Sequence, residues 1–150
     1  MAHDERADLL AFLAAQRSAV LAVVDGLDPV QMRTSVVPSG WTPESMLIHL
    51  GGAEDHWFAN VVGGLPPAPE LDEDGDAVTT YRRRIRTADR LLETAALDDG
   101  PRGTPSDGQE QLARSVRTVV LHMIEETARH AGHLDIAREL IDGTTGLGPR

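Results

Sequence analysis

The sequence predicts an all-α protein, a four-helix bundle whose helices are joined by long loops. In four separate stretches, apolar residues recur at spacings of three and four, which is the period of an amphipathic helix. Segments rich in proline and glycine separate these stretches, and no stretch has the pattern of a credible strand. The chain of 150 residues is long enough to bury a core, and we expect one domain over residues 1–150.

The first helix is expected from Asp4 to about Leu27, with acidic residues in its first turns, where they complement the helix dipole. It should end before Pro29, because the residue that precedes a proline is disfavoured in the helical region. Residues 30–40 then form a connecting loop, in which one short turn at 29–33 is compatible with the sequence.

The second helix has the clearest start signal in the chain. Thr42 is a good N-cap, and Pro43 fits the first helical position, where no backbone N–H is needed. The helix should run to about Val62, where a Gly-Gly pair stops it. Both tryptophans are expected to pack in the core rather than to bind a cofactor: Trp41 and Trp57.

The third helix is expected from Ala77 to about Leu97. Residues 65–76 before it are proline-rich and then acidic, and residues 98–109 after it contain several glycines and prolines, so both segments are expected to be loops. Five arginines of this helix are interpreted as a mostly outward, solvated face: Arg82, Arg83, Arg84, Arg86 and Arg90.

The fourth helix, Val116–Asp142, is the longest uninterrupted helical pattern. Ser115 is the preferred N-cap, because a start at Asp107, with Glu110 completing a capping box, would give a helix of about 50 Å at ~1.5 Å per residue. Gly143 is expected to end the helix. Its apolar stripe consists of Val116, Val119, Val120, Met123, Ile124, Leu134, Ala137 and Leu140.

Composition excludes several classes of function. The chain has no cysteine, so disulfides, thiolate metal sites and a cysteine nucleophile are excluded. A net charge of −10 argues against nucleic acid as a partner, because phosphate binding needs a basic surface. No apolar run approaches the ~20 residues of a membrane helix, and the N-terminus is charged, so we expect a cytoplasmic protein without a signal peptide. The helices have broad apolar faces, which are compatible with the pairing of two copies of the chain in a homodimer.

Four polar residues follow one edge of the last helix. His122, Glu126, His130 and His133 lie at i, i+4, i+8 and i+11, so their side chains project on nearly the same side. Imidazole and carboxylate are ligands of zinc-type metals, and a catalytic site uses three protein ligands with one position open. Either Glu126/His130 or His122/Glu126 can supply two ligands, and His49 on the second helix can supply a third.

Each histidine also has a structural interpretation. A histidine beside an apolar stripe, such as His49, is more often a hydrogen-bonded core residue than a ligand. His122 and His133 can be ligands, surface residues, or partners that orient a ligand through a hydrogen bond. His56 has the same alternatives, and we expect it to be exposed.

Two segments carry a resemblance to a known family. WTPESMLIHL, with His49 eight residues after Trp41, and HMIEETARHAGHLDIARELIDG resemble the DinB superfamily of metal-binding four-helix bundles. The branch that the sequence resembles most includes the N-terminal domain of mycothiol-dependent maleylpyruvate isomerase and the mycothiol S-transferases. Other members often have a third histidine where this branch, like this sequence, has a glutamate, Glu126. The resemblance covers nearly all of the chain and implies His49, Glu126 and His130 as metal ligands.

The resemblance also implies an enzyme activity. In such an enzyme a divalent metal activates a low-molecular-weight thiol, mycothiol, which attacks a small electrophile. Zinc is the expected metal, and nickel, iron and manganese are alternatives. The isomerase has a second, C-terminal domain that contributes to its active site, whereas this sequence ends at Arg150, so we expect S-transfer rather than isomerisation of maleylpyruvate. No motif marks the electrophile or the thiol-binding residues.

Two other functions stay open at the level of sequence. A metal-bound water with its pKa lowered toward ~7 would make the protein a hydrolase, with His122, His133 or His56 as general base. Alternatively, the bundle is not catalytic and binds a metal or small molecule, or only dimerises. Thiol dependence separates the transferase from the hydrolase, and metal content separates both from a structural bundle.

Overall fold

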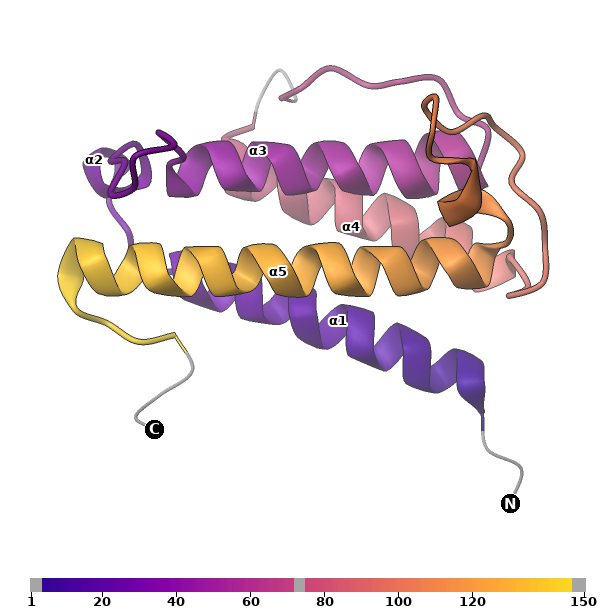
Figure 1. Ribbon diagram of the computed structural model, residues 1–150, viewed down its shortest axis with the longest axis horizontal. Coiled ribbons are helices and arrows are strands. Elements are labelled where there is room, and N and C mark those ends of the chain that lie inside the picture. Colours follow the sequence, from indigo (N-terminus) through magenta and orange to yellow (C-terminus); the bar gives the residue numbers. More distant parts are fainter. Residues whose placement is uncertain (1–3, 72–74, 147–150) are drawn as a thin grey trace.

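The computed structural model describes residues 4–71 and 75–146 and shows an all-α bundle, as predicted (Figure 1). No strand occurs in these residues. Two short elements, α2 (Pro29–Met32) and the 3₁₀ turn η2 (Glu110–Ala113), lie in the connections. The long elements are α1 (Glu5–Val24), α3 (Pro43–Glu54) continued by the π-helical segment η1 (Asp55–Val62), α4 (Ala77–Thr94) and α5 (Val116–Asp142).

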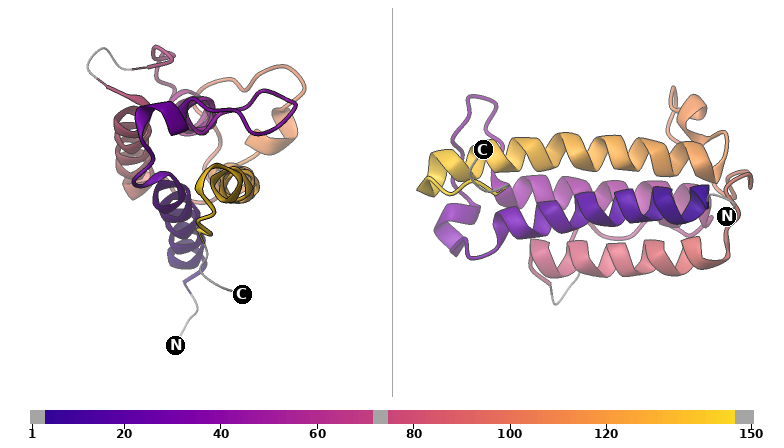
Figure 2. Two further views of the ribbon diagram at one scale, coloured as in Figure 1. Left: turned by 90° about the vertical axis from the view of Figure 1, so that its left-hand side faces the viewer. Right: turned by 90° about the horizontal axis from the view of Figure 1, so that it is seen from below.

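The four long helices occupy the corners of the bundle when it is viewed from its end (Figure 2). α1 and α5 run in one direction and pack along each other, whereas α3 and α4 run in the opposite direction (Figure 1). The chain must therefore return along the bundle between η1 and α4. This crossover is attached to the bundle by Arg84 and Asp55, which form an ion pair of 2.9 Å. Arg84 also donates to the carbonyl of Pro69, and the Ala68 amide donates to Asp55.

The predicted helix starts are confirmed by their capping hydrogen bonds. The hydroxyl of Thr42 accepts from the Ser45 amide, and Ser115 accepts from the Thr118 amide in the same way. Gly143 ends α5 with a φ of 78°, a left-handed conformation that favours glycine. The short turn allowed after Pro29 is α2.

Two helix ends come earlier than predicted. α1 ends at Val24 instead of about Leu27, because Asp25 is extended and Gly26 has a φ of 75°, so the chain has already turned. α4 ends at Thr94 because Ala95 is extended. Neither difference moves a residue of the candidate site.

The π-helical geometry of η1 was not predicted, because the sequence carries no residue that marks it. Its wider turn is visible in the hydrogen bond from the Gly63 amide to the Phe58 carbonyl, five residues earlier. The loop before α5 packs on the end of η1, where the Gly103 amide donates to Val61. A Cβ at Gly103 would lie 2.0 Å from the Asn60 carbonyl oxygen, so only glycine fits there.

The apolar core has two clusters, and a buried ion pair lies between α1 and α3. Arg17 is 4 % exposed and Glu54 is 1 % exposed, and their side chains form two hydrogen bonds of 2.7 and 2.6 Å. Arg17 also donates to Asp89 on α4. Patterns of apolar spacing do not predict such a pair, because its members are 37 residues apart.

Some residues are more exposed or more buried than the sequence predicts. Trp57 is buried, as predicted, but Trp41 is 41 % exposed because it lies in the loop before α3. Leu140 is 60 % exposed, because the last turns of α5 extend past the ends of α1 and α3 (Figure 1). Four of the five arginines on α4 are exposed as expected, whereas Arg84 is buried.

Among the described residues, α1 alone is long and apolar enough to cross a membrane by length and composition. In the bundle it packs along α5, with Leu13 and Val20 fully buried. A core helix of a bundle passes the same test, so this property is weak evidence for a membrane span.

Candidate metal centre

The antiparallel arrangement of α3 and α5 brings together His49, Glu126 and His130. Nε2 of His49 and Nε2 of His130 each lie 3.0 Å from the same oxygen, Oε1 of Glu126. Glu126 and His130 are one helical turn apart on α5, whereas His49 comes from the facing helix. One ligand atom from each residue lies within 4.8 Å of the other two, so the three side chains could hold one metal ion.

The spacing of these atoms fits a zinc-type metal. Tetrahedral ligands placed about 2.1 Å from zinc are ~3.4 Å apart. The two separations of 3.0 Å from the carboxylate oxygen need to widen only slightly, and the two imidazole nitrogens lie within 4.8 Å of each other. Two imidazole nitrogens and one carboxylate oxygen form a donor set found in catalytic zinc sites, where a fourth position is open to substrate.

Burial and charge favour the protonation states that a metal requires. Glu126 is mostly buried, which raises its pKa, but the hydrogen bonds and charges of His49 and His130 outweigh burial and hold this pKa below its ordinary value. Burial lowers the pKa of His130, against the opposing effect of Glu126. Near neutral pH these shifts favour an ionised carboxylate at Glu126 and a neutral imidazole at His130. These are the protonation states that bind a metal. The side chain of His49 is 39 % exposed, so the group opens toward solvent on that side.

Two further residues of α5 contact the candidate ligands. Nδ1 of His133 lies 3.1 Å from Nδ1 of His130, so His133 is placed to fix the orientation of that ring, one of its predicted roles. Arg129 donates to the second oxygen of Glu126 at 3.2 Å. Arg129 was not singled out from the sequence, although its position three residues after Glu126 on a helix was a usable signal.

His122 and His56 both pack against Trp57, with ring centroids 4.8 and 4.9 Å apart. Burial lowers the pKa of His122. The expectation that His56 is exposed was wrong: the residue is half-buried, and within the described part of the chain its buried Nε2 has no hydrogen-bond partner. Its ring packs on Trp57, which covers part of it.

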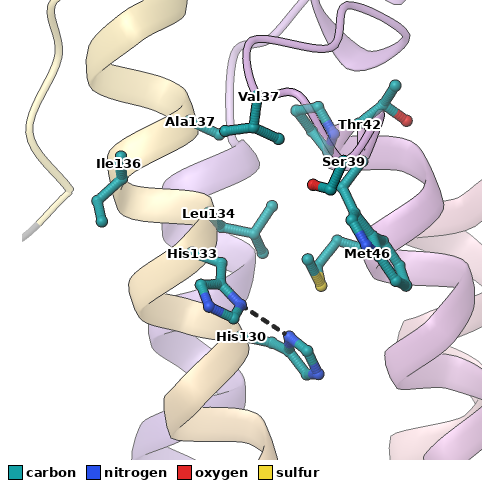
Figure 3. A pocket seen from close by; sticks show the side chains of 11 residues that line it. Val37, Ser39, Thr42, Met46, His130, His133, Leu134, Ile136 and Ala137 are labelled. Carbon is teal, nitrogen blue, oxygen red and sulfur yellow. Dashed lines mark hydrogen bonds between the residues drawn. The ribbon is translucent and has the colours of Figure 1, made fainter.

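Two cavities meet at the candidate metal centre, and Trp41 lines both. The apolar pocket, about 320 Å³, lies between α3, α5 and the loop before α3, and His130 and His133 lie at its edge (Figure 3). The polar groove, about 750 Å³, contains His49 and Glu126 in its lining, together with His56, Trp57, Ser106, Gln109 and His122. The three candidate ligands therefore lie on the boundary between an apolar and a polar cavity.

Comparison with known proteins agrees with this arrangement. The model of the mycothiol-S-transferase family matches residues 8–143, a range that includes all three candidate ligands. Searches of curated proteins and of solved structures find no match. Because the family match covers most of the chain, this protein belongs to the mycothiol S-transferase family.

Proposed function

We propose that residues 1–150 form a single metal-dependent domain that joins mycothiol, through its sulfur, to a small electrophile. Family membership supports the choice of thiol. The observation that carries the proposal is the convergence of His49 Nε2 and His130 Nε2 on one oxygen of Glu126, because this gives a three-ligand site with an open position.

Zinc is the metal we propose, held by His49, Glu126 and His130. Zinc bound by two neutral imidazoles and one carboxylate keeps a net positive charge, which favours the anionic form of a thiol with an ordinary pKa of about 8.5. His133 keeps the ring of His130 in its orientation, and Arg129 holds the second oxygen of Glu126. The absence of cysteine agrees with an enzyme whose nucleophile comes from a cosubstrate.

The polar groove is the proposed entry for the thiol. His49 and Glu126 line this groove, so a molecule bound there reaches the metal centre directly. In the described residues, two buried atoms that lack hydrogen-bond partners belong to residues of this lining: Nε2 of His56 and Oε1 of Gln109. Buried polar atoms are rarely unpaired in folded proteins, so these two atoms favour a polar ligand over an apolar one in this groove.

The test is a conjugation assay with zinc-loaded protein, mycothiol and a panel of electrophiles, with S-conjugates quantified by mass spectrometry. We expect conjugation above the uncatalysed rate by the wild type and its loss in His130→Ala. Glu125→Gln is the control, because Glu125 is an exposed neighbour on the same helix that contacts Arg129. His130→Ala that conjugates as fast as wild type would contradict the proposal, and turnover without added thiol would instead favour the hydrolase.

A further inference from the structure

The apolar pocket is separate from the polar groove in its chemistry. Leu134 and Ala137 of α5, Met46 of α3 and Val37 of the preceding loop contribute its apolar surface (Figure 3). Trp41 adds an aromatic ring, whose centroid lies 6.4 Å from that of His130. A cavity of about 320 Å³ is at the small end of the range for ligand pockets, so its size suits a small molecule with a single substituted ring.

None of the residues that line this pocket is an arginine, lysine, aspartate or glutamate. A carboxylate that lay in the pocket away from His130 and His133 would lose hydration without an arginine or lysine to pair with, which is unfavourable. The polar groove differs from the apolar pocket in this respect, because its lining includes two carboxylates, Glu70 and Glu126.

We infer that the apolar pocket binds the electrophile and selects neutral, hydrophobic molecules against those that carry a carboxylate. The inference rests on the proposed transferase function and adds the substrate class. The thiol reaches the centre from the polar groove, and the electrophile approaches from the opposite side, next to His130. With a benzylic chloride, the sulfur–carbon bond forms as the carbon–chlorine bond breaks. Chloride leaves with the electron pair, and the thiol proton passes to solvent.

A matched pair of substrates tests the selectivity. Methyl 4-(chloromethyl)benzoate and 4-(chloromethyl)benzoate have the same reacting carbon and differ in the charge of the remote group. After subtraction of the uncatalysed rate, we expect kcat/KM for the ester to exceed that for the carboxylate by tenfold or more. Equal values, or a preference for the carboxylate, would overturn the inference while the transferase function stands.

Binding without reaction tests the location. The unreactive analogues methyl 4-methylbenzoate and 4-methylbenzoate are titrated calorimetrically into zinc-loaded protein in excess mycothiol, so that the open metal position is not available to the carboxylate. We expect the ester to bind more tightly, and Ala137→Leu, which fills the pocket, to weaken its binding at least fivefold without changing zinc content. Ala14→Leu adds the same side chain at an exposed position of α1 and serves as the control.

The titrations of wild type and Ala137→Leu, together with the conjugation assay, distinguish failure of the pocket inference from failure of the proposed transferase function. If the ester binds and Ala137→Leu weakens this binding, but no conjugate forms with any electrophile, the result would support the pocket as the binding site and contradict the transferase function. Ester binding that Ala137→Leu leaves unchanged, in a folded variant, would place the ligand elsewhere and overturn the inference. If circular dichroism shows that Ala137→Leu is unfolded, Val37→Phe fills the same pocket from the loop and replaces it.

Discussion

Nε2 of His49 lies 3.0 Å from Oε1 of Glu126, although the two residues are 77 positions apart in the sequence. The contact joins two antiparallel helices, α3 and α5, at the boundary between the apolar pocket and the polar groove. A metal at this place would therefore be held by the packing of two helices rather than by one local motif. Affinity for the metal should depend on the residues that orient these side chains as well as on the ligands.

His133→Ala should weaken zinc binding, because it removes the hydrogen-bond partner of His130 Nδ1. Loss of such a partner typically lowers metal affinity roughly 10–100-fold. The measurement is competition with a zinc chelator, alongside thermal unfolding of the zinc-free protein, which should change little because His133 is exposed. His122→Ala is the control, since that ring packs on Trp57. Unchanged affinity in His133→Ala would show that the contact does not orient the ligand.

Glu54→Gln should strongly destabilise the bundle. The substitution leaves the buried guanidinium of Arg17 without its main counter-charge, and breaking a buried pair in this way costs about 3–5 kcal/mol. The free energy of unfolding in urea measures the loss. Glu125→Gln, which breaks an exposed pair with Arg129, should cost about 0.5 kcal/mol or less. A similarly small loss in Glu54→Gln would mean that the buried pair contributes little.

The start of α4 gives a prediction about pH. The Asp76 side chain caps the helix, and the hydrogen bond from the Thr79 amide holds the pKa of this carboxyl below its usual value. A carboxyl with a lower pKa in the folded state stabilises the protein above its unfolded pKa of about 3.9, and this contribution is lost as the pH falls through the folded value.

Asp76→Ala should therefore cost about 1 kcal/mol near neutral pH, and less in acid, where the wild-type cap is protonated. Asp76→Asn keeps a capping side chain that does not titrate and should show a weaker dependence on pH. Urea unfolding of the three proteins at about pH 7 and about pH 3 measures both effects. A gap between wild type and Asp76→Ala that stays constant over this range would contradict the assignment.

Local signals in the sequence predicted much of the helical framework. Thr42 and Ser115 cap helices because their side chains bond to amides only three residues away, so neighbouring sequence is sufficient to identify them. The edge formed by Glu126, His130 and His133 follows in the same way from the helical period. The contact with His49 came from the combination of a bundle fold and the family resemblance.

Features that depend on packing could not be predicted. The ion pair of Arg17 and Glu54 depends on which faces of α1 and α3 meet, and local apolar spacing does not determine that. The π-helical geometry of η1 has no residue signature. The burial of His56 depends on how its ring packs on Trp57, which spacing does not give. Trp41 lines two cavities because the loop before α3 places it there, and loop conformation does not follow from spacing.

The zinc content of protein purified without a tag, incubated with excess zinc and then desalted, tests the central claim most directly. We predict about one zinc per chain for the wild type and for Glu125→Gln, and far less for Glu126→Gln, because Glu126 is the carboxylate on which both imidazoles converge. Wild-type protein with far less than one zinc, or Glu126→Gln that retains as much as wild type, would contradict the account.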